Sequence, residues 1–366
     1  MKSAKEIRRD LRSQIALLDI QLAQAGDVAV TIICVPRHGH ATTRTTVESL
    51  YASTQVPFQL IVVDIASPES VQSYLEAEAH ARGNLFHLRL NEFVSRQTAR
   101  LVVLDRIQTP YTVLVDNNML FRLGWLEALL ACAEETGAAM VSPVIVTQGG
   151  HIHFSGGFIV EYEGGIVRPH TQKGGPVNTQ VEDARLERLE IDFAESHCCL
   201  ARTACLLRPD VMKEGMHNAQ TLCYAAYLLK HRDGARIVIE PSAVVALLPV
   251  SFGYDFPWMC QSYMDRELLR HTYEHLTALI GEGPSQDPDT SFEWHAMHFK
   301  YLLLTMLEDD RLNRTDLLRP DEVPAFVTGY DRPLPKDHMR QINEGIVPYV
   351  RRHHPSLLPQ MMQWME

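Results

Sequence analysis

Short apolar runs alternate with amphipathic stretches along the first half of the chain. The runs have the length and β-branched content of buried strands, and they occupy residues 28–35, 58–64, 85–90, 111–116 and 138–146. Stretches with helical periodicity lie between them, at 41–53, 68–81, 93–107 and 122–136. This alternation predicts an α/β domain with a mixed, mostly parallel sheet that helices cover on both faces.

Residues 4–25 carry a helical stripe of apolar side chains. Its members are Ile7, Leu11, Ile15, Leu18 and Leu22. Their spacing of three or four residues predicts one amphipathic helix, which Gly26 ends. We expect this helix to pack on its own domain, and the alternative is a partner subunit.

The pattern changes after residue 147. A Gly-rich segment at 147–189 predicts a hairpin followed by a loop. Strand-like runs return at 190–207 and 236–249, and a helix is expected between them at 219–232.

The last third of the chain has helical periodicity, at 254–280, 291–309 and 336–352. We therefore expect three regions: an N-terminal amphipathic helix (1–26), an α/β domain (27–250) and a helical C-terminal region (251–366).

Charge and composition narrow the classes of function. The 366 residues include 45 acids and 34 bases, and the net charge of −11 disfavours nucleic acid or an anionic membrane as a partner. No apolar run approaches the about 20 residues that span a bilayer, so we expect no integral membrane segment. Seven cysteines without a C-x-x-C pair, and an N-terminus without a signal-peptide core, indicate reduced thiols in a cytoplasmic protein.

Three polar segments follow strands of the expected sheet. They are Pro36–His40, Asp64–Pro68 and Asp116–Asn118. Ligands on such sheets bind beyond the carboxyl ends of the strands, so these segments predict a binding site on one edge. Taken alone, Asp116–Asn118 is more typical of a plain turn, because Asp and Asn bond their own backbone.

Six segments carry a family resemblance. In chain order they read VTIICVPRHGHATTRTTVESL, FQLIVVDIASPES, YTVLVDNN, GGHIHFSGGFI, CCLARTACL and DGARIVIEPSAVV. This succession resembles the glycosyltransferase family 2 proteins, which have the GT-A fold, over roughly residues 28–250. The resemblance implies a nucleotide-sugar donor carrying UDP, GDP or dTDP, and a saccharide or other hydroxyl acceptor.

The same resemblance implies contacts to the donor. Asp64 and Ser67 stand at the family's Asp-x-x-Ser strand end, which contacts the nucleoside. Pro36 lies in the family's first turn, and Arg202 is the basic residue of the later strand. The family's asparagine before the metal strand is missing, and Arg96 or Arg100 is a candidate phosphate contact instead; the alternative is a solvated arginine.

Asp116 stands at the first acid of the family's D-x-D motif, close to the diphosphate or its metal. Asn118 replaces the second acid. An asparagine oxygen can ligate Mn²⁺ or Mg²⁺ but brings no charge. The resemblance therefore implies a weakly held divalent cation at Asp116 and Asn118.

The acids that usually supply the family's catalytic base are missing. The matching positions are Leu222 and Ala225, neither of which accepts a proton. The candidate replacements are Asp192, Glu195, His197, Glu214 and His217. We favour Glu195 and His197 as the base, because strand residues two apart share a face. The alternative is an ordinary polar pair at a strand end.

Two functions remain open at this stage. The first is metal-assisted transfer of a sugar to a hydroxyl, with inversion. The second, which the missing acids favour, is a catalytically silent GT-A-like binding or scaffold protein. His151 and His153 form an H-x-H pair, for which we expect packing rather than metal binding.

Overall fold

A computed structural model describes residues 2–248 and residue 351, except for positions 25, 27, 38–39, 41, 93, 163–165, 171–178 and 215–217. The expected helical region at 251–366 lies outside the described residues, apart from residue 351. The domain boundaries drawn near residues 26 and 250 stay predictions.

The strands begin and end close to the predicted positions. They are β1 (Val30–Val35), β2 (Gln59–Ile65), β3 (Leu85–Leu90), β4 (Tyr111–Asp116), β5 (Met119–Phe121), β6 (Met140–Thr147), β7 (Ile152–Phe154), β8 (Phe158–Tyr162), β9 (Ile166–His170), β10 (Leu189–Glu190), β11 (Cys198–Arg202) and β12 (Ile237–Leu247).

Most helices match the predicted stretches, but α7 lies within residues 190–207, which were predicted as a strand-like run. They are α1 (Ala4–Asp10), α2 (Arg12–Gln24), α3 (Thr43–Ser53), α4 (Glu69–Ala81), α5 (Arg96–Leu104), α6 (Trp125–Thr136), α7 (Thr203–Leu206), α8 (Asn218–Tyr227) and the π-helical turn η1 (Leu228–Arg232). None of the helices in the described part is long and apolar enough to cross a membrane.

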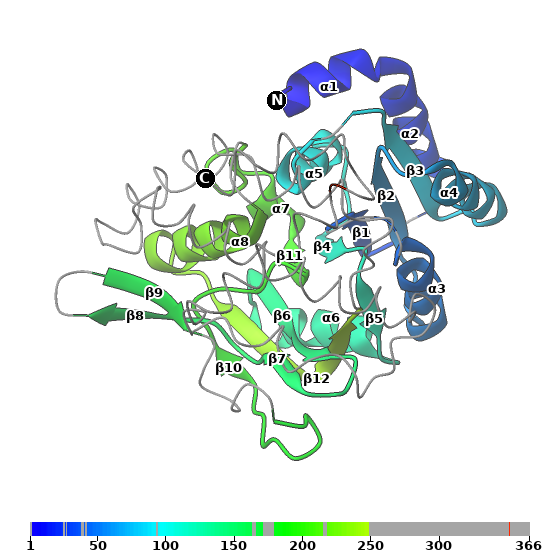
Figure 1. Cartoon of the computed structure of the whole chain (residues 1–366). Helices are drawn as coiled ribbons and strands as arrows, with labels where there is room; N and C mark the ends of the chain where they lie inside the picture. Colours follow the sequence, from blue (N-terminus) through cyan, green and yellow to red (C-terminus); the bar gives the residue numbers. More distant parts are fainter. Residues whose placement is uncertain are drawn as a thin grey trace.

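One mixed sheet forms the centre of the molecule, in the order β10-β12-β6-β11-β4-β1-β2-β3, with β5 on β12 and β7 on β6 (Figure 1). Strands β1, β2, β3 and β4 are parallel, β11 runs against its neighbours β4 and β6, and β6 is parallel to β12. Strands β8 and β9 form a separate hairpin. The expected mixed, mostly parallel α/β sheet is confirmed over the described residues.

Helices pack on this sheet as the chain order requires. Helices α3 and α4 connect strands that step from β1 to β3, whereas α5 connects the step back to β4. Right-handed crossovers place α5 on the opposite face from α3 and α4. Helix α5 packs on β1 and β2, α4 packs on β3, and α6 packs on β6 and β12. The strands β1, β2 and β4 are buried along their whole length.

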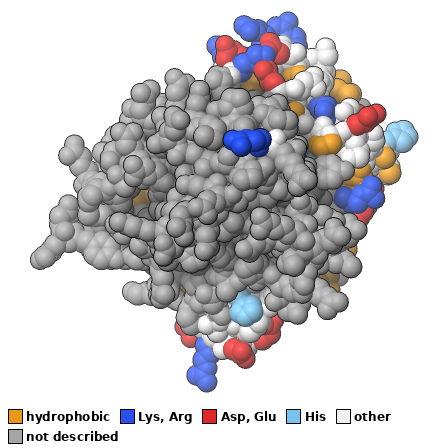
Figure 2. Space-filling model, in the orientation of Figure 1, with side chains coloured by type: hydrophobic (Ala, Val, Ile, Leu, Met, Phe, Trp, Pro, Cys, Tyr) orange, Lys and Arg blue, Asp and Glu red, His pale blue; other side chains and the backbone are white. Residues whose placement is uncertain are grey.

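The N-terminal stripe packs on the same core, as predicted. Helix α1 contacts α5, and α2 contacts β3. Ile7, Ile15 and Leu18 are buried in the shared hydrophobic cluster. The predicted single helix is interrupted at Leu11, which caps α1. On the face drawn in Figure 2, basic and acidic side chains are mixed at these helices, where Lys2 pairs with acids.

The sheet topology brings four chain segments to one edge. Val35 of β1 lies beside Asp116 of β4, and β2 ends next to them at Ile65. Strand β11 is antiparallel to β4, so its first residue, Cys198, pairs with Val115 at the same edge. The carboxyl ends of β1, β2 and β4 and the turn before β11 therefore surround one place.

Candidate functional site

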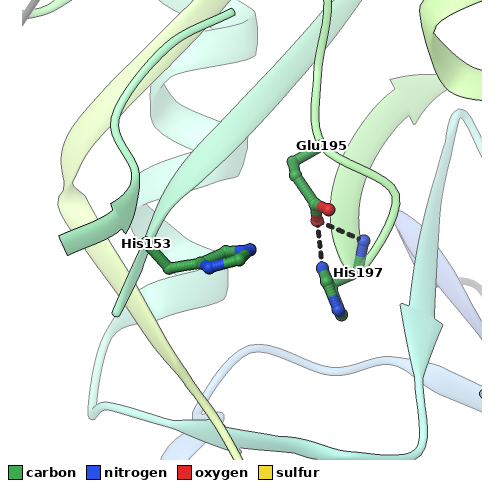
Figure 3. Close-up of side chains that lie close together, drawn as sticks. All are labelled: His153, Glu195 and His197. Carbon is green, nitrogen blue, oxygen red and sulfur yellow. Dashed lines mark hydrogen bonds and ion pairs between the residues drawn. The ribbon is translucent and has the colours of Figure 1, made fainter. Parts of the chain in front are cut away.

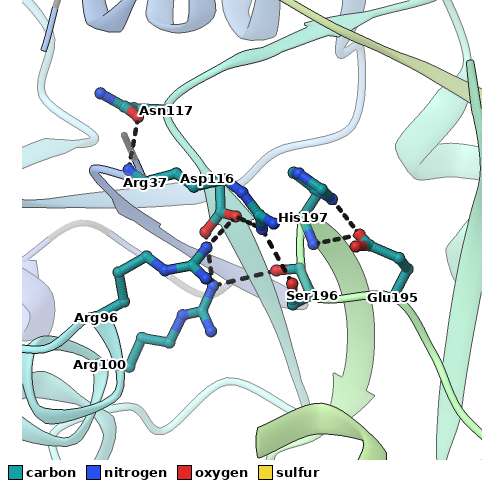
Figure 4. A network of polar contacts seen from close by, with 8 residues as sticks. All are labelled: Arg37, Arg96, Arg100, Asp116, Asn117, Glu195, Ser196 and His197. Atoms are coloured by element: carbon teal, nitrogen blue, oxygen red, sulfur yellow. Dashed lines mark hydrogen bonds and ion pairs between the residues drawn. The ribbon is translucent and has the colours of Figure 1, made fainter. Parts of the chain in front are cut away.

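Asp116, the last residue of β4, is enclosed by three arginines (Figure 4). Arg37 and Arg96 each donate from Nη1 to Asp116 Oδ2, at 2.9 and 2.5 Å. Arg100 donates from Nη2 to Asp116 Oδ1 at 2.9 Å. All four residues are buried, and neither Asp116 nor Arg100 has any exposed surface. We call Arg37, Arg96 and Arg100 the arginine cluster.

The arginine cluster keeps Asp116 ionised. Burial would raise the pKa of the carboxyl group, but the charges of the three arginines outweigh burial and hold that pKa below its usual value. Arg100 Nε and Nη1 have no hydrogen-bond partner among the described residues. Three guanidinium charges surround one carboxylate, and an excess of buried positive charge suits an anionic ligand.

Local structure explains how the arginines reach Asp116. Arg37 follows the end of β1, and its backbone N donates to Asn117 Oδ1 at 3.0 Å. Arg96 and Arg100 lie one turn apart on α5 and so share a helix face. A basic residue in the first turn of a helix opposes the helix dipole, and the contact with Asp116 offsets this for Arg96.

The two asparagines after Asp116 differ in role. Asn117 is structural, because its Nδ2 donates to Thr43 Oγ1 at 2.9 Å while its Oδ1 accepts from Arg37. The backbone oxygen of Asn118 accepts from Leu248 N at 2.7 Å. Asn118 Oδ1 is buried and has no hydrogen-bond partner among the described residues.

A divalent cation does not suit Asp116 and Asn118 in this arrangement. Both carboxylate oxygens of Asp116 already accept from guanidinium groups. The remaining ligand would be the uncharged Asn118 oxygen, and a cation there would be close to three positive side chains.

Asp64 and Ser67 come together at the end of β2, as predicted. Ser67 donates to Asp64 from its backbone N at 3.0 Å and from Oγ at 2.8 Å. Two residues of the neighbouring β3 also reach Asp64 Oδ2, His87 Nε2 at 3.1 Å and Arg89 Nη1 at 2.7 Å. Burial would raise the pKa of Asp64, but the hydrogen bonds from His87 and Ser67 lower it overall.

Glu195 and His197 lie in a turn before β11. Glu195 Oε2 accepts from the backbone N of His197 at 2.7 Å and also contacts His197 Nδ1. Ser196 interacts on the other side, where its Oγ accepts from Arg37 Nη1 at 3.0 Å (Figure 4). The two residues are paired as expected, but the reason given was wrong: the turn brings them together, not a shared strand face.

In this pair the imidazole of His197 is neutral and the carboxyl group of Glu195 is ionised. Burial lowers the pKa of His197, and so does the charge of Arg37. Burial would raise the pKa of Glu195, but His197 and Arg37 outweigh burial and lower it. At neutral pH the result is an uncharged imidazole beside an ionised carboxylate, which is a possible proton acceptor.

His153 of β7 completes a group with Glu195 and His197 (Figure 3). One possible ligand atom from each of the three lies within 4.8 Å of the others. The rings of His153 and His197 meet edge to face, with centroids 5.6 Å apart. Burial lowers the pKa of His153 to about 4, so this imidazole is neutral at pH 7. Its neighbour in the H-x-H pair, His151, bonds Gln180 instead.

Arg202 does not fit the donor contact expected of it. It pairs with Tyr111, the first residue of β4, and therefore lies at the opposite edge of the sheet from Asp116. Its guanidinium donates to the backbone oxygens of Ala138 and Ala133. Pro36, by contrast, is buried at the end of β1 beside Arg37 and lies at the expected edge.

The other candidate bases are engaged elsewhere. Asp192 accepts from Lys230 Nζ at 2.6 Å, and Glu214 accepts from the backbone of the N-terminal helix. His217 lies outside the described residues. Leu222 and Ala225 are fully buried, so the helix α8 offers apolar packing at the family's acidic positions.

Sequence reasoning missed Arg37, His87 and Arg89. A signal existed for the last two, because they interrupt the otherwise apolar run of β3, whose register sets Arg89 beside Asp64. Arg37 directly follows a strand-end proline, and the position of that strand end could have singled it out.

One protein-family model matches part of the chain. Residues 31–202 match the family model described as glycosyl transferase family 2. That segment contains Asp64, Asp116, the arginine cluster and the Glu195–His197 turn. No curated protein matches the sequence.

Solved structures that match this chain have low sequence identity to it. GalNAc-T7 with UDP, GalNAc and Mn²⁺ is 12% identical, with a TM-score of 0.46; the match covers 79% of this chain and 59% of that one. TarS 1–349 from S. aureus is 14% identical, with a TM-score of 0.44, over 92% of this chain and 87% of that one. The complex of TarS 1–349 with UDP-GlcNAc is 15% identical, with a TM-score of 0.46, and the match covers 92% of this chain and 88% of that one. Likenesses with TM-scores below 0.5 carry no conclusion about this chain's ligands.

Proposed function

Residues 31–202 are a glycosyltransferase family 2-like segment, and from this premise we propose that the protein transfers a sugar from a nucleotide-sugar donor to a hydroxyl acceptor. The observation that carries the proposal is the coincidence of the family match with a strand-end site. Asp64, Asp116 and the Glu195–His197 turn all lie at the edge of the sheet where such folds bind ligands.

The donor's diphosphate would face the arginine cluster, and its nucleoside would lie near Asp64 and Ser67. The imidazoles of His153 and His197 are neutral. The three guanidinium groups carry three positive charges, and the carboxylates of Asp116 and Glu195 offset two of them, so the site has a net positive charge of one. Guanidinium groups match phosphate oxygens in geometry and charge. Such a site would stabilise the negative charge that develops on the nucleoside diphosphate as it leaves.

No step of this proposal uses a metal at Asp116. The cation expected there does not suit the three guanidinium groups, whose unmatched positive charge would partly offset the charge of the diphosphate. Transfer with inversion needs one in-line displacement and one base. Glu195 and His197 would supply that base, because their hydrogen-bonded pair combines a neutral imidazole with an ionised carboxylate.

A second candidate function is a catalytically silent donor-binding protein. The specific observation in its favour is the burial of Leu222 and Ala225 at the positions of the family's acidic pair. This candidate predicts binding of the nucleotide-sugar without turnover.

Calorimetric titration with UDP, GDP and dTDP, in chelator, tests where the donor binds. We expect one of the three to bind without added metal. Loss of a hydrogen bond to a charged group removes ~1.5–3 kcal/mol, so Arg37→Met should weaken binding by roughly 10-fold to 150-fold. The matched control is Arg202→Met, because Arg202 is at the opposite sheet edge.

Two results would contradict the proposal. If none of the nucleotides binds with or without Mn²⁺, the sugar-donor site is refuted. If binding requires Mn²⁺ and is lost in Asp116→Asn but not in Arg37→Met, the metal reading of Asp116 replaces the arginine reading.

A further inference from the structure

Three side chains of the types that bind transition metals converge beside the arginine cluster. His153 comes from β7, while Glu195 and His197 come from the turn before β11. Figure 3 shows the ring of His153 directed towards the other two side chains. The family resemblance assigns no cation to these residues.

We propose that His153, Glu195 and His197 form a binding site for a divalent transition-metal cation, separate from Asp116 and with coordination positions open to an exogenous oxygen ligand. The existence of this site does not depend on sugar transfer. Its use in the reaction, described below, rests on the proposed function.

The geometry is close to that of a bound site. The three possible ligand atoms lie within 4.8 Å of one another. Two ligand atoms that each lie about 2.0–2.2 Å from one ion in tetrahedral geometry are about 3.4 Å apart. Side-chain rotations that move the ligand atoms by about an ångström would close the difference.

The ligand set selects the class of cation. Two imidazole nitrogens and one carboxylate oxygen suit Zn²⁺, Mn²⁺, Fe²⁺ or Co²⁺, whereas Mg²⁺ and Ca²⁺ prefer oxygen ligands alone. Three protein ligands leave at least one position for another oxygen, as in catalytic rather than structural zinc sites.

Surrounding contacts fix the turn that carries Glu195 and His197 in place. Arg37 Nη1 and Arg100 Nη2 donate to the side chain and backbone oxygens of Ser196, between the two proposed ligands. The backbone oxygen of His197 accepts from Asp116 N at 2.8 Å. Outer contacts of this kind orient metal ligands. The arginine cluster therefore holds the metal-binding turn as well as Asp116.

The cation would change how the acceptor is activated. Glu195 and His197 cannot accept a proton while they ligate a metal, so the metal-bound mechanism and the metal-free base pair are alternatives. A hydroxyl bound at an open position of a divalent cation would lose its proton to water more readily. Its oxygen would then bond to the anomeric carbon of the sugar as the bond from that carbon to the diphosphate breaks. If the proposed transfer occurs, the acceptor hydroxyl would bind at this cation, and the donor's diphosphate would bind at the arginine cluster.

The role of His153 separates this proposal from a metal-free base pair. A Glu195–His197 base needs no third side chain, whereas the metal site does. The test is calorimetric titration of the chelator-treated full chain with ZnCl₂, MnCl₂ and MgCl₂, with no nucleotide present. The variants are His153→Gln and Glu195→Gln, and the matched control is His151→Gln, which changes the other histidine of the same H-x-H pair.

We expect Zn²⁺ and Mn²⁺, but not Mg²⁺, to bind to the wild type and to His151→Gln. Affinity should fall at least 100-fold in His153→Gln and Glu195→Gln. Unchanged affinity in His153→Gln overturns the proposal, and so does the absence of Zn²⁺ binding by the wild type. If circular dichroism shows that a variant is unfolded, the visible absorption spectrum of the Co²⁺-loaded wild type replaces that variant as the test. Absorption bands typical of nitrogen and oxygen ligands support the proposal, and their absence refutes it. Because no nucleotide is used, this outcome is independent of donor binding.

Discussion

The substitution Asp116→Asn tests the ion-pair arrangement at the strand end. Asparagine has nearly the same shape but removes the negative charge that three buried guanidinium groups share, at 2.9, 2.5 and 2.9 Å. Removing one partner of a buried ion pair typically destabilises a protein by ~3–5 kcal/mol, because the other charge is left buried and uncompensated. For a domain of this size ~1 kcal/mol shifts the Tm by ~2–4 °C, so we expect a fall of ~6–20 °C.

The assay is thermal and urea unfolding at pH 7 in the presence of chelator. The double variant Asp116→Asn/Arg37→Met removes one of the uncompensated cations, so it should be more stable than the sum of the two single changes predicts. The pKa of Asp116 is lowered in the folded protein. The stability it contributes is therefore present above its unfolded value of about 3.9 and is lost as the pH falls below that value. The difference between wild type and Asp116→Asn should shrink below about pH 4.

The opposite result would refute this reasoning. If Asp116 were an unneutralised carboxylate waiting for a cation, asparagine would relieve a buried charge. The metal-free variant would then be as stable as the wild type or more stable.

Two further predictions concern packing and thiol chemistry. A Cβ on Gly157 would lie 2.5 Å from the buried ring of Phe193, whereas one on Gly83 meets nothing within 4 Å. Gly157→Ala should therefore destabilise the protein by ~1–3 kcal/mol, while Gly83→Ala should be near neutral. Equal unfolding curves for the two variants would contradict this. Burial raises the pKa of Cys199 to about 12. An alkylating reagent followed by peptide mass spectrometry should therefore label the half-buried Cys205 before Cys199. Faster labelling of Cys199 would contradict the buried-thiol account.

The sequence was sufficient for β1, β2, β3, β4 and β6, because their apolar runs are continuous and their ends are polar. Asp64, Asp116 and Pro36 were correctly expected at one edge, since parallel strands share the direction of their carboxyl ends. Arg96 also reaches that edge because α5 begins just after β3. These conclusions need only local pattern and topology.

Contacts that depend on strand direction and long-range turns could not be predicted. Arg202 is the last residue of β11, which runs antiparallel to β4, so this end of β11 lies away from the site. The sequence motif alone does not reveal the direction of the strand. His153 was expected to pack, since nothing local indicates that β7 runs next to the turn of Glu195 and His197. The presence of Asn118 in place of a second acid did not indicate that three arginines would surround Asp116.

The most direct test of the proposed function is release of nucleoside diphosphate from UDP-, GDP- and dTDP-sugars by the full chain, with a panel of hydroxyl acceptors. The account predicts acceptor-dependent release with one nucleotide class. The rate should fall ~10²-fold to 10⁴-fold in Glu195→Gln and stay unchanged in the surface control Glu190→Gln. Tight donor binding with no release from any sugar, or an equal rate in Glu195→Gln, would contradict it.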